Sequence, residues 1–152
     1  MKQTLLFAFI ALTFLCGCSK TQYYTHQVNY INGDAHTLSL RSIGLGSNRY
    51  KAIEDAELSA IETLLFRGIP ASQQKDPLAA LNENEALQKH KEYFDELLGN
   101  GRYKTFIISS IPVGEMSRHK GATRQMPVDV KINLRALRSD LEQHNIIRSF
   151  GY

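Results

Sequence analysis

The feature that most constrains the fold is one long amphipathic stretch, residues 49–67. Acidic residues lie in its N-terminal half and Arg67 at its C-terminal end, so the charges complement a helix dipole. Gly68 and Pro70 predict the helix end, while residues 44–48 (Gly-Leu-Gly-Ser-Asn) are expected to break a preceding strand and to supply a serine or asparagine cap. The apolar side chains that recur at the three-to-four-residue spacing of a helix face are Ile53, Ala56, Ala60, Ile61, Leu64 and Leu65.

Three further segments have the patterns of β-strands. Residues 37–43 and 128–134 alternate between apolar and polar side chains, which predicts strands with one buried face. Residues 103–111 carry no charge after Lys104, which predicts a central strand that is covered on both faces and ends at Pro112. Strands and helices in such proportions predict packed layers around one core.

The remaining elements complete an α+β chain. Residues 27–31 alternate weakly, and Asn32-Gly33 after them predicts a hairpin turn with positive φ at both residues. Residues 84–98 and 135–145 have helical periods, and residues 71–82 are polar enough to predict a connecting loop. The predicted order is β-α-α-β-β-α with an optional extra strand at the front. We expect the helices to pack on a small mixed or antiparallel sheet.

The N-terminus has the pattern of a secretory signal. One cation, Lys2, precedes the uncharged stretch 5–15. This stretch has 11 residues, whereas a membrane-spanning helix needs about 20, so an uncleaved transmembrane segment is disfavoured. A cytoplasmic protein with a buried N-terminal helix remains the alternative. Removal of residues 1–17 leaves 135 of the 152 residues, enough for one domain with a core.

The end of this stretch, Leu15-Cys16-Gly17-Cys18, resembles a bacterial lipobox. The resemblance implies cleavage before Cys18, alkylation of its thiol by diacylglycerol and acylation of its new amine. Several acyl chains hold a protein on a bilayer where a single chain does not. The expected domains are a signal peptide at 1–17, a lipid anchor and tether at 18–29, and a single α+β domain at 30–152.

The residues after Cys18 bear on the choice of membrane. Position 19 is Ser19, and resemblance to Gram-negative lipoproteins implies that an aspartate there favours retention in the inner membrane. Residues 19–22 also lack the acidic cluster of some surface-exported lipoproteins. We therefore expect a lipid-anchored protein on the periplasmic face of the outer membrane.

Cysteine content and charge exclude some functions. Cys16 leaves with the signal peptide and Cys18 carries lipid, so no disulfide or thiol chemistry is expected. The mature chain retains 17 of the 18 Lys and Arg against 15 Asp and Glu, an excess too small to predict a nucleic-acid partner.

No catalytic, metal or cofactor motif is expected. Residues 43–49 lie between a strand and a helix, where a phosphate loop would lie, but Arg49 replaces the third glycine of the dinucleotide fingerprint. We expect those glycines to turn the chain and to allow close helix packing instead. Glu92, Asp95 and Glu96 fit a solvated helix face better than a glycosidase pair. The five histidines have no zinc-binding spacing, and no Gly-x-Ser-x-Gly nucleophile motif is present.

The one candidate binding surface is basic. Residues 112–127 connect two predicted strands through 16 residues and contain Arg118, His119, Lys120 and Arg124 against one acid. A long basic loop on a sheet is suited to bind a partner protein, anionic lipid headgroups or a glycan. A mobile, solvated hairpin is the alternative interpretation.

A second resemblance covers residues 40–70. Gly44-x-Gly46, then residues 52–56 (Ala-Ile-Glu-Asp-Ala), then Ala60-Ile61 are similar to small α+β domains of bacterial envelope lipoproteins and to the N-terminal module of a flagellar assembly protein. The resemblance implies a scaffold or assembly role and no catalytic residues. We expect a non-enzymatic accessory subunit of a larger envelope complex, such as a contractile secretion system, a pilus or a transport complex. A small periplasmic hydrolase and a ligand- or peptidoglycan-binding module are the alternatives.

Overall fold

The computed structural model describes residues 27–79, 82–121 and 123–148, and the protein is α+β as its sequence predicts. Cys18 and the predicted signal peptide lie outside these residues. The elements are β1 (Val28–Gly33), β2 (Thr37–Gly46), α2 (Arg49–Phe66), α3 (Glu83–Lys89), α4 (Lys91–Phe94), the π-helical turn η2 (Asp95–Gly99), the 3-10 helix η3 (Arg102–Phe106), β3 (Ile107–Pro112), β4 (Ser117–Arg118), β5 (Arg124–Asn133) and α5 (Leu134–Gln143). Within the described part of the chain, no helix is both long and apolar enough to cross a bilayer.

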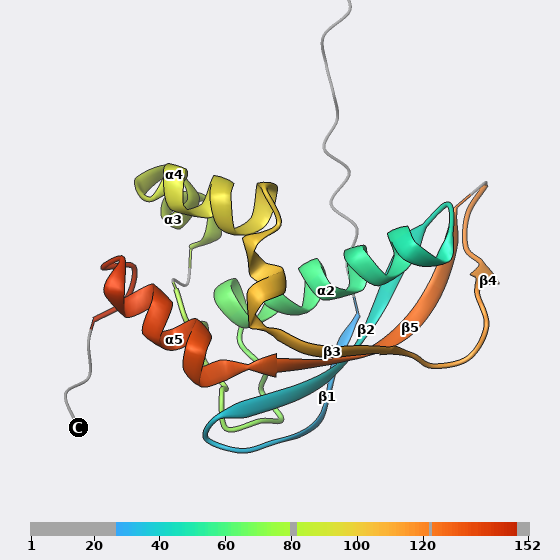
Figure 1. Cartoon of the computed structure of the whole chain (residues 1–152), viewed down its shortest axis with the longest axis horizontal. Helices are drawn as coiled ribbons and strands as arrows, with labels where there is room; N and C mark the ends of the chain where they lie inside the picture. The colour runs from blue at the N-terminus through green and yellow to red at the C-terminus, as the bar shows by residue number, and fades with distance from the viewer. Residues whose placement is uncertain (1–26, 80–81, 122, 149–152) are drawn as a thin grey trace, which may run out of the picture.

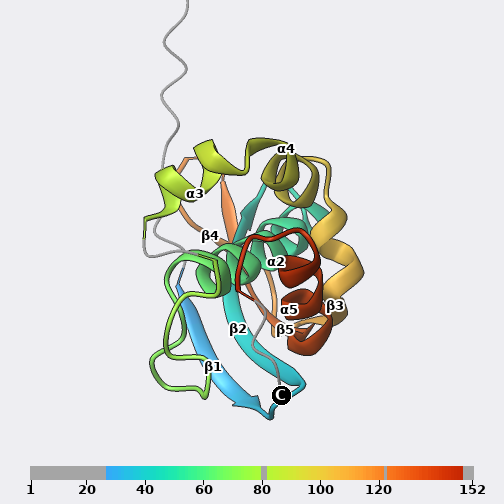
Figure 2. The same ribbon diagram turned by 90° about the vertical axis from the view of Figure 1, so that its left-hand side faces the viewer.

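The sheet is antiparallel, with strand order β1-β2-β5-β3 and with β4 paired to the start of β5. The two long central strands pair along their whole length, from Thr37 opposite Asn133 to Gly46 opposite Arg124. The helices lie on one face of this curled sheet (Figures 1 and 2). The other face carries side chains such as Arg41, which forms a bidentate ion pair with Asp129 through contacts of 2.7 and 2.8 Å.

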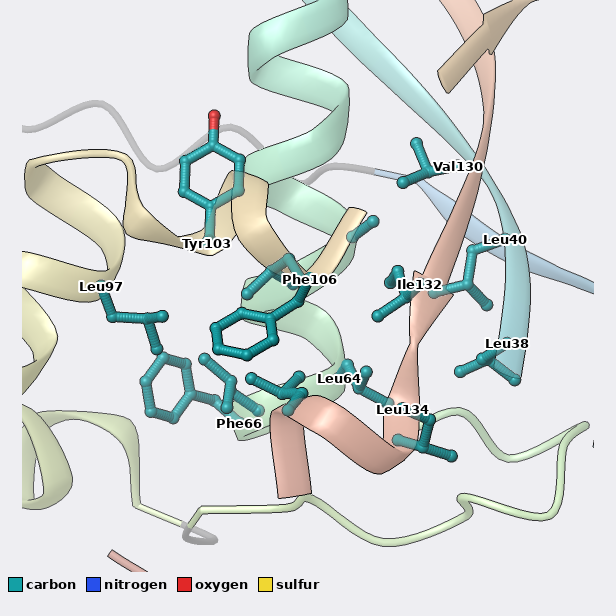
Figure 3. Close-up of a cluster of buried hydrophobic side chains, with 14 of the residues drawn as sticks. Leu38, Leu40, Leu64, Phe66, Leu97, Tyr103, Phe106, Val130, Ile132 and Leu134 are labelled. Carbon is teal, nitrogen blue, oxygen red and sulfur yellow. The ribbon is translucent and has the colours of Figure 1, made fainter. Parts of the chain in front are cut away.

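Helix α2 lies over the sheet and forms the centre of the core, as its periodicity predicts. Asn48 caps its start, because the side-chain oxygen accepts a hydrogen bond from the Lys51 amide at 3.0 Å. Gly68, with a φ of 74°, ends it and donates its amide to the Thr63 carbonyl at 2.8 Å. Figure 3 shows the core between the helix, the sheet and the later helices, with Leu40, Leu64, Phe66, Leu97, Phe106, Val130 and Ile132 among its side chains.

Gly44 and Gly46 lie inside β2, so the prediction that they break the strand is wrong. They are needed for the close approach of α2 instead. A Cβ on Gly44 would lie 1.8 Å from the Ala52 carbonyl oxygen, and one on Gly46 would lie 2.5 Å from the Ala52 amide nitrogen. The helix backbone therefore rests directly on the strand, which is the packing role expected of these glycines.

The first hairpin turn also differs from its prediction. Asn32 and Gly33 belong to β1, and neither has a positive φ. The turn follows them, where the Asp34 carboxylate accepts hydrogen bonds from the amides of His36 and Thr37, both at 2.7 Å. These two backbone bonds lower the pKa of Asp34. The Asp34 side chain thus satisfies the backbone amides of His36 and Thr37 in the turn, as aspartate commonly does in turns.

The predicted helix at 84–98 is broken into α3, α4 and η2. His90 separates the first two with a φ of −122° and a ψ of 41°, outside the helical range. No glycine or proline marks this break in the sequence. Tyr93, Phe94 and Leu97 are still buried in the core, and the Phe94 ring lies 5.4 Å from the ring of Phe66 at the end of α2.

The predicted central strand at 103–111 is wrong in two respects. Its first part is the helix η3, in which Tyr103 and Phe106, three residues apart, both point into the core. The strand that follows, β3, is an edge strand of the sheet. Ile108 and Ile111 are 50% and 61% exposed, so β3 is covered on one face only.

The C-terminal prediction is confirmed with small changes of boundary. The predicted strand at 128–134 is the second half of β5, which begins at Arg124. Helix α5 follows with no loop, because the Asn133 side chain caps it by accepting from the Ala136 amide at 3.0 Å. Leu137 and Leu141 are fully buried, as the helical spacing predicts.

Candidate functional site

The basic residues predicted as a binding loop lie on a β-hairpin arm. Arg118 and Arg124 are directly opposite each other where β4 pairs with β5. His119 and Lys120 follow in the turn, which is closed by the His119 amide bonded to the Thr123 carbonyl at 3.0 Å. All four predicted residues are exposed. The arm projects beyond the core at the same end of the molecule as the start of α2 (Figure 1).

We call this region the basic end, defined as the described residues 46–51, 113–121 and 123–124. Its cations are Arg49, Lys51, Arg118, Lys120 and Arg124, and its one acid is Glu115. Within the described residues, Lys51 is the only one of these cations that forms an ion pair. Tyr50, 62% exposed, lies beside them.

A shallow open cavity of about 610 Å³ lies next to the basic end, between the start of α2 and the segment that joins η2 to η3. We call it the groove. Its lining residues are Leu45, Gly46, Ser47, Lys51, Glu54, Asp55, Leu58, Leu98, Gly99, Asn100, Gly101, Tyr103 and Lys104. Glu54 and Lys104 are 50 residues apart, so no local motif announces this site.

Glu54 is the electrostatic centre of the groove. Its two carboxylate oxygens contact Lys104 Nζ at 2.6 Å and Lys51 Nζ at 3.1 Å. The hydrogen bonds from Lys104, which has the larger effect, and from Lys51 lower the pKa of Glu54 to about 2. The bond to Glu54 in turn raises the pKa of Lys104. Both ammonium groups lie 5.8 Å from the ring centre of Tyr50, within range of a cation–π interaction.

This arrangement suits binding better than proton transfer. A carboxylate with a pKa far below neutrality is a weak base, and an ammonium with a raised pKa is a weak nucleophile. The neighbouring Asp55 carboxylate accepts a hydrogen bond from the Leu45 amide at 2.7 Å. Burial raises the pKa of Tyr103 to about 12, so its hydroxyl stays neutral. The groove therefore offers two fixed cations, and the exposed ring of Tyr50 lies beside them.

A second polar cluster holds the helices together. Arg102 Nη1 contacts Asp140 Oδ1 at 2.8 Å, and the Tyr93 hydroxyl donates to the other oxygen of Asp140 at 2.6 Å. Burial raises the pKa of Asp140, but the bonds from Arg102 and Tyr93 outweigh it and lower the pKa. The cluster joins η3 and α4 to α5 and is a structural one. The exposed Asp95 pairs with Lys91, as expected for a solvated helix face.

Glu62 on α2 is the one described carboxyl group whose pKa rises to about 7. Burial is the main cause, and the charges of Glu83 and Asp55 add to it, while Arg67 opposes it. The group therefore titrates near neutrality although no sequence motif marks it.

No group of three or more metal-ligating side chains occurs in the part of the chain that the structure describes. Comparisons of the chain with known protein families, with curated proteins and with solved structures find no match. Its function is therefore inferred from the sequence, the groove, the basic end and the exposed isoleucines of β3.

Proposed function

We propose that this chain is a non-enzymatic, lipid-anchored protein of the bacterial envelope and an accessory or scaffold subunit of a larger assembly, such as a secretion system, a pilus or a transport complex. Cys18 holds it on the periplasmic face of the outer membrane. The observation that carries the assembly role is the pair of exposed isoleucines, Ile108 and Ile111, on the edge strand β3.

These two side chains stabilise a complex if a partner covers them. Full burial of an isoleucine contributes about 1.5–3 kcal/mol. Ile108 and Ile111 are 50% and 61% exposed, so covering them adds about 1–2 kcal/mol each. A bulge between Ile107 and Ser109 and the ring of Pro112 interrupt the strand edge. The partner is therefore a protein with an apolar surface rather than an added strand.

The state of the titratable groups in the groove also supports a non-enzymatic role. Glu54 is ionised and held between Lys51 and Lys104. Each of its oxygens accepts a hydrogen bond from one of these lysines, which leaves no poised acid–base pair among these three groups.

The anchor rests on the sequence and is tested first. Cys18→Ser removes the thiol that the lipid would modify. We expect the variant to lose the lipid mass, because serine has no thiol, and to be recovered either uncleaved or as a soluble domain without lipid. Mass spectrometry of the purified protein reads both, and a lipid mass unchanged from wild type would contradict the anchor.

The assembly role is tested by co-purification from detergent-solubilised membranes. Ile108→Lys with Ile111→Lys places two charges on the proposed contact and should abolish recovery of the partner. Gln88→Lys with Gln143→Lys adds the same charge at exposed positions on α3 and α5 and is the matched control. Recovery of the wild-type chain as a monomer alone, or equal recovery of the partner with both double variants, would refute this role.

The groove supports a second candidate function, the binding of peptidoglycan. Lys51 and Lys104 line the groove, and Tyr50, which lies beside these two cations, offers a ring on which a sugar can stack. Co-sedimentation with purified sacculi tests it. Tyr50→Ser with Lys104→Ala should release the protein from sacculi, whereas Lys91→Ala, at an exposed ion pair outside the groove, should not.

A further inference from the structure

The basic end concentrates the positive charge of the protein. It holds five Lys and Arg against one acid, and the rest of the chain holds 13 against 14. The positive net charge of the chain therefore comes entirely from the basic end, because the rest of the chain has one more acid than cations. Among the described residues, Arg49, Arg118, Lys120 and Arg124 have no acidic partner.

Two of these cations are placed at an energetic cost. Arg118 and Arg124 face each other directly across the β4–β5 pair, where like charges destabilise a sheet. Arg124 is also opposite Gly46, which faces α2, so the register puts both arginines on the α2 side of the sheet. An anionic surface at this end would offset that repulsion.

The described part of the chain begins close to this end. The Gln27 carbonyl accepts a hydrogen bond from the Ile43 amide at 3.0 Å, and Val28 is opposite Ser42. Gly46, at the basic end, is three residues beyond Ile43, which is about 10 Å along the strand. Strand β1 then runs away from the basic end, so Gln27 lies at the end of β1 that is nearer to the basic end.

The reach of the tether is sufficient. Nine residue steps separate Cys18 from Gln27, and an extended chain of this length spans about 30 Å. A coiled chain of the same length has an end-to-end distance of about 17 Å. Either distance allows the basic end to touch a bilayer that holds Cys18.

We propose that the basic end is a docking surface for anionic phospholipid headgroups, which seats the β4–β5 arm and the start of α2 on the membrane. This inference rests on the lipid anchor of the proposed function. Tyr50 lies at the same end and is 62% exposed, and tyrosine is suited to the headgroup region because its ring is apolar and its hydroxyl polar. In this orientation Ile111, opposite Asp129 and five residues along β5 from Arg124, remains free for a protein partner.

The test uses the lipidated full chain reconstituted in vesicles. Ser117→Cys adds a thiol on β4 for a fluorophore. The label attaches only there, because the lipidated mature chain has no other free cysteine. Quenching by bromine-labelled lipids reports contact of the arm with the bilayer. Each cation near an anionic surface favours the bound state about fivefold, so three contribute about 100-fold at low salt. Quenching should therefore be strong in vesicles with phosphatidylglycerol, weak in pure phosphatidylcholine and lost at high salt.

The charge-reversed variant Arg118→Glu, Lys120→Glu, Arg124→Glu should lose this quenching. The control variant Lys75→Glu, Lys89→Glu, Arg135→Glu changes the net charge equally at exposed positions outside the basic end and should retain it. Circular dichroism of both variants verifies folding.

The two proposals can fail separately. If Cys18 is lipidated but quenching is equal in both vesicle types, the docking surface is overturned and the anchor stands. This holds even if the charge-reversed variant loses a protein partner in the co-purification test. An unmodified Cys18, read from the protein mass, overturns the anchor and this membrane orientation with it. Lipidation together with salt-sensitive quenching that only the basic-end variant loses supports both.

Discussion

The contact between α2 and β2 leads to a prediction about a single methyl group. Gly44 is buried under the helix, and an added Cβ would lie 1.8 Å from the Ala52 carbonyl oxygen and 2.8 Å from the Ala56 Cβ. Carbon atoms pack favourably at separations of about 3.5–4 Å. Gly44→Ala therefore forces the helix backbone away from the strand by more than 1 Å, because a carbonyl on the backbone has no rotamer with which to yield.

The expected cost is large for so small a change. Overpacking of a core by a methylene costs about 1–3 kcal/mol and occasionally more. The clash at Gly44 involves backbone on both sides and separates Ala52 and Ala56 from the sheet, so we expect about 3 kcal/mol or more. For a domain of this size, that loss lowers the melting temperature by about 10 °C. The whole free energy of unfolding of such a domain is about 5–15 kcal/mol.

Urea and thermal unfolding of the purified protein, followed by circular dichroism, measure this loss. Gly99→Ala is the matched control, because a Cβ there meets no atom within 4 Å and its φ is not positive. We expect the control to be neutral or slightly stabilising, since alanine restricts the unfolded chain. If Gly44→Ala and Gly99→Ala unfold within about 1 kcal/mol of each other, close backbone packing does not explain the glycine, and the reasoning is refuted.

Three further substitutions test individual groups. Because the pKa of Glu62 rises from 4.5 unfolded to about 7 folded, the folded state binds the extra proton between these values, and wild-type stability falls as pH rises through them. Thermal unfolding at about pH 5 and about pH 8 should show that Glu62→Gln removes this fall; an unchanged slope would contradict it. Asp140→Asn weakens the bonds to Arg102 and Tyr93 and should cost about 1–3 kcal/mol at neutral pH in urea unfolding. Because folding lowers the pKa of Asp140, the carboxylate stabilises the protein above its unfolded-state pKa, and this stabilisation is lost as pH falls through its folded-state pKa. A cost of Asp140→Asn that persists in strong acid would therefore count against the ion pair. Asn48→Ala removes the α2 cap and should lower the free energy of urea unfolding by about 0.5–2 kcal/mol, whereas no change would mean that water replaces the cap.

Local patterns account for much of the fold. The helix at 49–66 and the strand of residues 128–133 are set by periods that the sequence displays directly. The edge position of β3 is not local information, because an apolar run such as residues 106–108 fits a strand with either one or two neighbours. The break at His90 depends on which sides of α3 and α4 can reach the core, and no residue type announces it.

The candidate sites show the same division. The basic residues could be predicted because Arg118, His119 and Lys120 are adjacent in the sequence. Their arrangement as a paired arm opposite Arg124 could not, since it depends on strand register. The groove escaped prediction because Glu54 meets Lys104 only after η3 folds against α2.

Both edge strands of the sheet carry a bulge, between Tyr30 and Asn32 in β1 and between Ile107 and Ser109 in β3. The lipid anchor proposed for Cys18 would confine molecules to two dimensions, where neighbours meet far more often than in free solution. Under such crowding, a straight edge strand would be a template for polymerisation from one molecule to the next. The bulges disrupt each edge as a template for a second copy, so a membrane-bound chain of this kind would resist edge-to-edge polymerisation and stay available to a different partner.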